Sequence, residues 1–333
     1  MKFLVFADFH YKKRMYAATI DGFEQILAHA KAENVDFILH AGDFCNDYAN
    51  SPELMSKYLQ NSYGLPVYGV YGNHELETVG NSMDVVTPLL CNRPVTFGAS
   101  DEPVGYWYTD IQNFRLIGLD SNYSFNPDTK AWEHNHSASY GCPAGNQKSD
   151  SLAPAQLTWL DEVLADTAKQ EKKAIVIAHS SFSGIWESSP DSDAVRAIFA
   201  KYPKTVLLSI NGHLHTDHFA IRDDVAYFDV NTVTNGHWEK TTEFHYANDH
   251  TFPFTDYDEN GNAIATEAMP INKLRQATNT WFFTDPIHAI VTVTENGHIE
   301  IEGMKTTWLY GVKPPREVEG VKTEIGSFTA DLF

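Results

Sequence analysis

The chain has 333 residues, of which 43% are hydrophobic and 20% are charged. These values are ordinary for a globular protein with one large core or two smaller ones, and no stretch of about 18 apolar residues is present to span a membrane. The formal net charge of −20 opposes binding to the phosphate backbone of long nucleic acid. We therefore expect a small ligand rather than a long polyanion, although the same charge also serves solubility.

Predicted strands and helices alternate through the first half of the chain. Two segments, 20–30 and 157–164, carry apolar residues at helical spacing. Another helix is expected after Ser51-Pro52, because serine and proline are favoured at a helix N-terminus. This alternation indicates an α/β fold with at least partly parallel sheets. Short apolar runs predict strands at residues 3–7, 37–41, 67–71, 114–119, 174–178 and 206–210.

Two regions depart from this alternation. Residues 121–151 form a polar insert without clear periodicity, and an insert of this length is expected to be a functional loop over a binding site. After residue 240 helical signals become rare, and residues 289–294 and 298–302 flank Glu295-Asn296-Gly297, which is typical of a β-hairpin. We therefore expect a main domain at 1–240 and a β-rich C-terminal extension at 241–333, packed on that domain.

The three cysteines, Cys45, Cys91 and Cys142, show no metal-type or redox-type spacing. Their odd number argues against a full disulfide framework, so we expect reduced thiols, with a single Cys91–Cys142 bridge as the alternative. The first predicted strand begins at Lys2, which leaves no room for a signal peptide before it. We therefore expect a cytoplasmic protein, unless an export signal has been removed.

Polar clusters follow five of the short apolar runs, at the strand ends where open α/β sheets bind ligands. Together they offer carboxylate, imidazole and amide groups, which suit two divalent metal ions, and two adjacent metals favour hydrolysis of a phosphate ester. Asp43 is the natural bridging carboxylate, because Gly42 allows a close approach of the backbone. The clusters are Asp8-Phe9-His10, Gly42-Asp43, Gly72-Asn73-His74-Glu75, Ala178-His179 and Gly212-His213-Leu214-His215.

In this order the clusters resemble the pattern of the calcineurin-like metallophosphoesterase superfamily, which runs D-x-H, G-D, G-N-H-[DE], a lone H and G-H-x-H. The segment Gln156-Leu157-Thr158-Trp159-Leu160 and the tripeptide Leu119-Asp120-Ser121 are also similar to family sequences. The resemblance covers about residues 1–235. It implies an α/β fold of two mixed β-sheets in a sandwich flanked by helices.

The resemblance also implies a role for each position. A hydroxide that bridges the two metals would attack phosphorus, and His74 would protonate the leaving oxygen. Mixed nitrogen and oxygen ligands suit Mn, Fe and Zn alike, so the identity of the metals is left open. One metal would be held by Asp8, His10, Asp43 and His215, and the other by Asp43, Asn73, His179 and His213.

Some family features are missing from the sequence. Asn46 stands where members often carry an aspartate, so a carboxylate partner for His74 is not assigned. The G-D-x-V-D-R-G pattern of Ser/Thr protein phosphatases and the G-D-x-x-Y pattern of purple acid phosphatases are both absent. The sequence therefore favours the cyclic-nucleotide and general phosphodiesterase branch.

Other polar and aromatic residues give weaker signals. For His134 and His136 a solvated loop is favoured over a substrate contact, because no strand precedes them. His237 is equally compatible with a substrate contact and with a packing role. The segment Asp256 to Glu267 fits the EF-hand calcium expression, but a hairpin turn is favoured. Aromatic residues expected either to stack a nucleobase or to pack the insert are Tyr123, Phe125, Trp132, Tyr140 and Trp186.

The sequence thus predicts a dinuclear phosphoesterase for a small phosphodiester or phosphomonoester, with cyclic nucleotides as one candidate. A nuclease is disfavoured because no basic stripe is present, and a non-catalytic metal-binding scaffold is disfavoured because every expected ligand is present. The oligomeric state is left open. Candidate substrate contacts are Asn73, His74, His237, Tyr123 and Tyr140.

Overall fold

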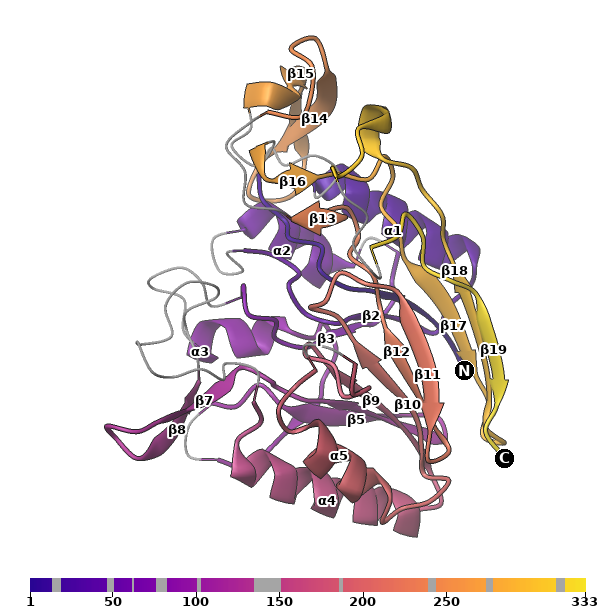
Figure 1. The fold of residues 1–333 in the computed structure, drawn as a ribbon. Helices are drawn as coiled ribbons and strands as arrows, with labels where there is room; N and C mark the ends of the chain where they lie inside the picture. The colour runs from indigo at the N-terminus through magenta and orange to yellow at the C-terminus, as the bar shows by residue number, and fades with distance from the viewer. Residues whose placement is uncertain are drawn as a thin grey trace.

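Two mixed β-sheets pack face to face in the computed structural model, and helices cover their outer faces (Figure 1). The arrangement confirms the predicted fold class. The structure describes residues 1–13, 19–46, 51–61, 63–75, 83–100, 103–134, 151–185, 188–238, 244–273, 278–315 and 321–333.

The first sheet contains strands from both the N-terminal and the C-terminal parts of the chain. Its strand order is β19-β18-β17-β1-β2-β3. Strands β1, β2 and β3 are parallel, whereas β17 lies antiparallel to β1. The predicted strands of this region and the C-terminal hairpin are confirmed. The bounds are β1 Lys2–Phe6, β2 Phe37–His40, β3 Val67–Gly69, β17 Ala289–Val293, β18 His298–Gly303 and β19 Phe328–Asp331.

The second sheet has the strand order β11-β12-β10-β9-β6-β5-β4. Its four inner strands β12, β10, β9 and β6 are parallel, and the outer ones pair antiparallel. The strands predicted here are confirmed. The bounds are β4 Thr96–Phe97, β5 Trp107–Ile111, β6 Phe114–Gly118, β9 Lys173–Ala178, β10 Val206–Asn211, β11 His218–Arg222 and β12 Val225–Asp229.

The helices lie on the outer faces because alternate strand residues point to opposite sides of each sheet. Val5 and Ile177 belong to the core between the sheets, whereas Phe6 packs with Phe23 of the first helix on the outside. The predicted helices are confirmed, and the second begins at Pro52. The bounds are α1 Ile20–Ala32, α2 Pro52–Gln60, α3 Met83–Val86, α4 Pro154–Lys169 and α5 Ser192–Phe199, with short 3₁₀ turns at Thr87–Leu89, Ile271–Lys273 and Leu309–Gly311.

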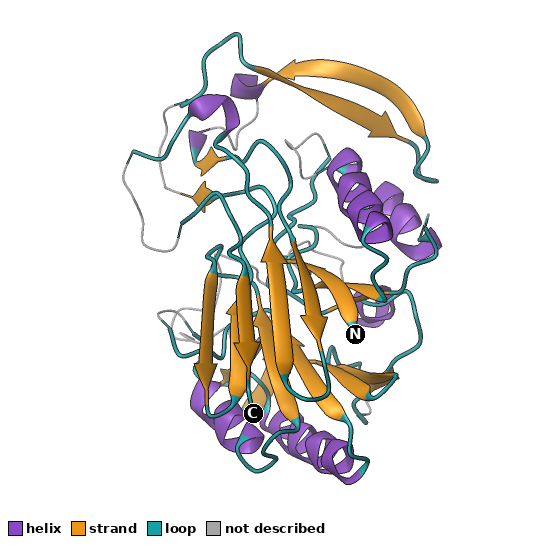
Figure 2. Ribbon diagram, turned by 90° about the vertical axis from the view of Figure 1, so that its right-hand side faces the viewer, coloured by secondary structure: helices purple, strands orange, loops and turns teal. Residues whose placement is uncertain are grey.

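Three two-stranded ribbons complete the described structure. The β14–β15 ribbon lies beyond α1 and α2, at the end of the molecule opposite α4 and α5 (Figures 1 and 2). It contains the segment that fits the calcium expression, and Asp256 and Glu267 lie in its two paired strands. The favoured hairpin is therefore confirmed. The ribbons are β7 Tyr123–Asn126 with β8 Ala131–His134, β13 His237–Trp238 with β16 Thr280–Trp281, and β14 Thr251–Tyr257 with β15 Ala263–Pro270.

The described residues also bear on membrane-spanning helices and on the state of the cysteines. No helix among them combines the length and the apolar character that a membrane crossing requires. Cys91 is a free thiol, and Cys142, its alternative partner, lies outside the described residues.

Candidate metal centre

Five parallel strands from the two sheets end at one place, and the loops that follow them touch. Asp8 N donates to Gly42 O at 3.1 Å, which joins the loops after β1 and β2. Gly212 N donates to His179 O at 2.9 Å, which joins the loops after β10 and β9. A Cβ atom on Gly212 would lie 2.9 Å from Ala41 O, so this glycine lets the loops of the two sheets approach each other.

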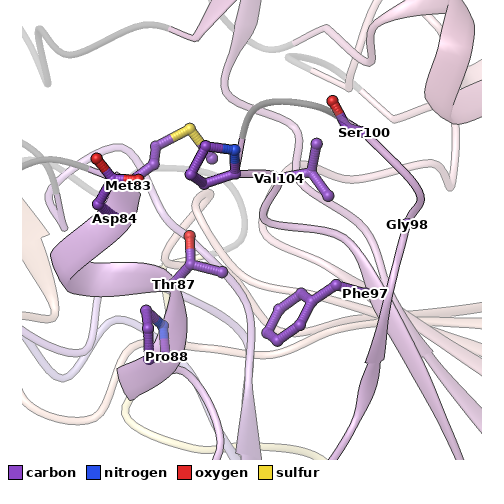
Figure 3. A pocket seen from close by; sticks show the side chains of 9 residues that line it. Met83, Asp84, Thr87, Pro88, Phe97, Gly98, Ser100 and Val104 are labelled. Carbon is purple, nitrogen blue, oxygen red and sulfur yellow. The ribbon is translucent and has the colours of Figure 1, made fainter.

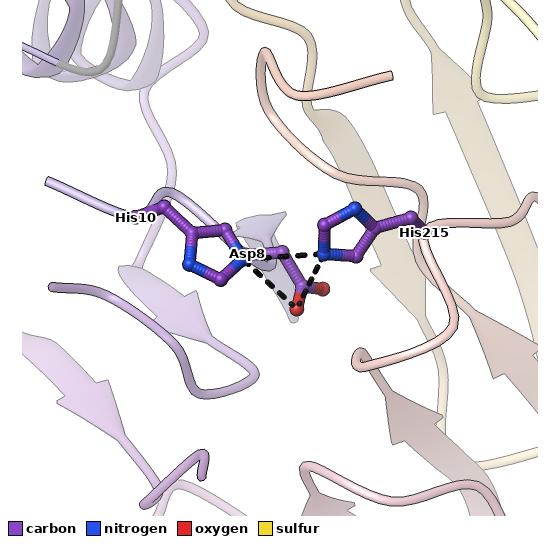
Figure 4. Close-up of side chains that lie close together, drawn as sticks. All are labelled: Asp8, His10 and His215. Carbon is purple, nitrogen blue, oxygen red and sulfur yellow. Dashed lines mark hydrogen bonds and ion pairs between the residues drawn. The ribbon is translucent and has the colours of Figure 1, made fainter. Parts of the chain in front are cut away.

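The first predicted ligand set comes together as expected from the sequence (Figure 4). His215 Nε2 lies 3.3 Å from Asp8 Oδ1 and 3.2 Å from His10 Nε2. His10 Nε2 also lies 3.8 Å from Asp43 Oδ2. Four side chains from three loops therefore converge on one point.

The second predicted set lies beside the first and shares Asp43 with it. His179 Nε2 is 3.3 Å from Asp43 Oδ2 and 3.0 Å from Asn73 Oδ1. His213 Nδ1 is 3.0 Å from Asn73 Oδ1 and 3.2 Å from His179 Nε2. Asp43 thus lies between the two sets, where a bridging carboxylate is required.

Backbone contacts orient two of the predicted histidine ligands toward the centre. A carbonyl oxygen only accepts, so His179 Nδ1 donates to Ala41 O at 2.7 Å and His215 Nδ1 donates to Asn235 O at 3.1 Å. Each Nε2 atom is therefore the nitrogen left to bind a metal, and it offers a lone pair once a metal replaces any proton on it. Imidazole nitrogens and carboxylate oxygens that gather at 3–4 Å need protons or cations between them, so this donor set fits metal ions.

The electrostatics of the buried side chains agree with a cation site. Burial raises the pKa of Asp43, but the charges of His179, His74 and His10 and a hydrogen bond from His179 together outweigh burial and hold this pKa well below its usual range. Burial acts on Asp8 in the same way, and His215 lowers the pKa of that carboxyl. Burial opposes a charge on His179, yet Asp43 and Asp8 raise its pKa to about 10. Burial lowers the pKa of His10 to about 4, which leaves its ring neutral.

Most of the seven ligand positions adopt a backbone conformation that L-residues rarely accept. Such left-handed conformations cost about 1–3 kcal/mol each and persist at functional sites that the surrounding structure constrains. The φ angles are +54° at Asp8, +52° at His10, +49° at Asp43, +71° at His213 and +51° at His215.

Comparison with known proteins identifies the family. A family model described as calcineurin-like phosphoesterase matches residues 1–217. The chain belongs to the calcineurin-like phosphoesterase family. The resemblance inferred from the five clusters is thereby confirmed, and the site described above is that of a dinuclear metal-dependent family.

Comparison with solved structures gives matches at low sequence identity. A dimetal phosphatase from Danio rerio is 13% identical with a TM-score of 0.55, and the match covers 100% of this chain and 99% of that one. A putative 5′-nucleotidase from Staphylococcus aureus is 17% identical with a TM-score of 0.45, covering 81% and 54%. GAP50, the anchor in the inner membrane complex of Plasmodium, is 13% identical with a TM-score of 0.46, covering 99% and 88%. No curated protein sequence matches the chain.

Two residues that support the predicted metal ligands were not assigned a role from the sequence. Asn46 Oδ1 accepts from His10 Nδ1 at 3.1 Å, so Asn46 orients a predicted ligand. Glu75 is buried and accepts from the backbone N–H groups of residues 43, 44, 45 and 72. Glu75 belongs to the G-N-H-E cluster, but its sequence position alone does not reveal which backbone groups it holds.

His74, the predicted general acid, lies at the edge of the centre. Its backbone N–H donates to Asp43 Oδ1 at 2.9 Å, and its Nε2 lies 3.8 Å from Asp43 Oδ2. The ring packs edge-on against His10 with centroids 4.8 Å apart. Its side chain is 18% exposed, compared with 3% for His10, so a substrate can reach it.

One interpretation of the insert is wrong. His134 does not lie in a solvated loop: it ends strand β8, its side chain is 5% exposed, and its Nε2 lies 2.9 Å from Asp120 Oδ2. No strand was predicted here because β7 and β8 have only four residues each. His136 lies outside the described residues.

The remaining candidate substrate contacts are only partly described. Tyr123 is buried, and buried His237 lies against Trp281 with ring centroids 5.5 Å apart. Phe125 and Trp132 are exposed and meet edge to face at 6.0 Å. Tyr140 and Trp186 lie outside the described residues, so the predicted aromatic wall stays a prediction.

A surface groove lies between α3 and the segment 97–104 (Figure 3). Its volume is about 530 Å³, and the described residues that line it include no Lys or Arg. One lining residue, Thr87, places its Oγ1 2.9 Å from the hydroxyl of Tyr71, which precedes Asn73 by two residues. The lining residues are Met83, Asp84, Thr87, Pro88, Phe97, Gly98, Ser100, Pro103 and Val104.

Proposed function

We propose that the chain hydrolyses a small phosphodiester or phosphomonoester at a dinuclear metal centre, with a cyclic or linear nucleotide as one candidate substrate. The observation that carries this proposal is the pair of four-residue ligand sets that share Asp43. Asp8, His10 and His215 would complete one set. Asn73, His179 and His213 would complete the other.

When bound, two divalent cations would clamp the phosphoryl oxygens and lower the pKa of the attacking water. The protein side chains supply the rest of the chemistry. Asp43 fixes the spacing of the two sets, and its Oδ1 holds the backbone of His74 in place. The accessible ring of His74 is positioned to give a proton to the leaving oxygen, which is the general-acid role we propose for it.

The size of the substrate is inferred from charge and shape. The net charge of −20 disfavours a long polyanion, because many unneutralised phosphates would be brought toward an acidic surface. The described lining of the groove beside α3 carries no Lys or Arg, so it suits an uncharged part of a small ester better than a second phosphate. These points support a small-molecule esterase over a nuclease of the same family. The intact ligand sets support catalysis over a non-catalytic scaffold.

The test compares bis-p-nitrophenyl phosphate with p-nitrophenyl phosphate, using metal-free protein reloaded with Mn²⁺. We expect turnover that requires the metal, and we expect Asp43→Asn to reduce it by ~100-fold or more because both sets lose their common carboxylate. Asp193→Asn is the matched control, because the Asp193 side chain is 95% exposed on α5. Preference for the diester or the monoester would identify the substrate class. Two bound metals without turnover of either ester would favour the scaffold, and failure to bind metal would overturn the proposal.

A further inference from the structure

A buried histidine–aspartate contact lies beside the metal centre and has no assigned role. Asp120, two residues after β6, has a fully buried side chain, and His134 of β8 places Nε2 2.9 Å from its Oδ2. The other carboxylate oxygen accepts from Asn122 N at 3.0 Å and from Asn122 Nδ2 at 3.1 Å. A desolvated carboxylate is tolerated only when its oxygens are satisfied, so His134 supplies a bond that Asp120 requires.

Aromatic rings fix the orientation of His134. Tyr71 and Tyr123 both meet the imidazole edge-on, with ring centroids 5.3 and 5.1 Å away. The hydroxyl of Tyr71 lies 2.9 Å from Thr87 Oγ1, which anchors that ring from its far end. His134 therefore has little freedom to leave Asp120, and the β7–β8 ribbon is held against the strand that leads to Asn73.

The segment that follows Asp120 touches two of the four loops that carry the second ligand set. Ser121 Oγ accepts from Ser180 N at 3.1 Å, and Ser180 follows the ligand His179. Asn122 Nδ2 donates to Tyr71 O at 3.3 Å. Asn122 is itself held by Asp120, so a shift of this carboxylate is transmitted to the backbone next to Asn73 and His179.

We propose that His134, acting through Asp120, is a positioning residue for the metal set formed by Asn73, His179 and His213. This inference rests on the proposed function, because it assumes that the set binds a metal. Loss of the His134 bond leaves a buried carboxylate one donor short, and the segment 120–122 relaxes to satisfy it. Supporting groups of this kind change metal affinity or activity by about 10–100-fold.

The experiment measures Mn²⁺ binding to metal-free protein by titration calorimetry, together with kcat and KM. His134→Phe preserves a ring between the two tyrosines but removes the donor to Asp120. We expect this variant to bind one of the two Mn²⁺ ions with an affinity lower by ~10-fold or more. We also expect kcat to fall, with KM changed much less. His134→Gln retains an N–H donor, and we expect it to restore both quantities to within about threefold of the wild type.

The control is His298→Phe, which removes a similar histidine–aspartate contact at the outer sheet edge, His298 Nδ1 to Asp331 Oδ1 at 2.7 Å. It should leave both metal affinities unchanged. If His134→Phe fails to fold, His134→Gln and the shorter His134→Asn replace it, and only the Asn variant should lose affinity. Wild-type affinity and kcat in His134→Phe, or equal losses in the Gln and Asn variants, would overturn the inference. A wild type that does not bind two Mn²⁺ ions would instead refute the proposed function.

Discussion

At the scale of single residues, Glu75 is the group on which the geometry of Asp43 depends. Its two carboxylate oxygens accept four backbone N–H groups, three of them from residues 43 to 45 and the fourth from Gly72. These bonds tie the loop after β2 to the loop after β3. They also hold Asp43 at its φ of +49°, a conformation that the loop would otherwise leave.

We predict that Glu75→Gln destabilises the fold and weakens metal binding. One oxygen becomes an NH₂ group that faces two backbone N–H donors, so those donors lose their acceptor. The expected loss in free energy of unfolding is about 2–3 kcal/mol, measured by urea denaturation, with a parallel loss of Mn²⁺ affinity in calorimetry. The control is Glu33→Gln, at the half-exposed residue that follows α1, because its surface ion pair with Lys2 contributes little to stability. A Gln variant with the stability of the wild type would contradict the role given to Glu75.

The sequence predicted the residues of the site better than their supporting contacts. The order of the five clusters was sufficient to place seven ligand side chains, which the structure brings together. Asn46 carried no comparable signal, because its contact with His10 depends on how two loops meet. His134 was misinterpreted for a similar reason: its contact with Asp120 depends on how the insert folds back, and a separation of 14 residues leaves no local pattern.

At the scale of elements, local periodicity was a good guide wherever an element was long. α1 and α4 were predicted because their buried residues recur at helical spacing. α5 was missed, although Val195, Ile198 and Phe199 are buried on one face, because eight residues give only two turns of pattern. The β7–β8 ribbon was missed because its strands have four residues each, which is too few for a period to show.

A histidine pair connects α1 to the segment before β17 and gives the fold a pH dependence. His288 is buried, and its Nε2 lies 2.6 Å from His29 Nδ1. Burial, together with His29, lowers the pKa of His288 to about 3. The unfolded chain therefore binds a proton at this residue at a higher pH than the folded chain does.

We predict that this residue makes the protein less stable as the pH falls from about 6.5 toward 3. The pKa of His288 is lower in the folded chain than in the unfolded chain. Its contribution to the free energy of unfolding is therefore complete above the unfolded-state pKa and is lost as the pH falls toward the folded-state pKa. The slope is ~1.4 kcal/mol per pH unit inside that window. Urea unfolding of wild type and His288→Gln at pH 7, 6, 5 and 4 measures it as the difference between the two slopes. Parallel slopes for the two proteins would contradict the prediction.

At the scale of the whole molecule, the C-terminal strands complete the sheet that carries Asp8. β17 pairs with β1 from Lys2↔Thr292 to Val5↔Ala289, and β18 and β19 extend the sheet beyond it. Sequence periodicity predicted β17 and β18 as a hairpin but not their neighbour, because pairing between residues almost 290 positions apart leaves no local pattern. The division at residue 240 stays a prediction, and the pairing gives it a direct test.

We predict that a fragment of residues 1–240 does not fold cooperatively. It leaves one edge of β1 without its partner and removes buried side chains such as Val291, Val293, Ile299 and Ile301 from the core between the sheets. At about 1.5–3 kcal/mol each, their loss is on the order of 10 kcal/mol, which equals the whole stability of many domains.

Circular dichroism, urea unfolding and Mn²⁺ titration of the fragment measure this effect. The control is the full chain with residues 255–266 replaced by Asn-Gly. That change shortens the β14–β15 ribbon beyond the pair Phe254↔Glu267 and leaves both sheets intact. The control should unfold cooperatively and bind two metals, because the ribbon contributes no strand to either sheet. A fragment of 1–240 that does the same would show that β17 to β19 are dispensable for holding Asp8 in the centre.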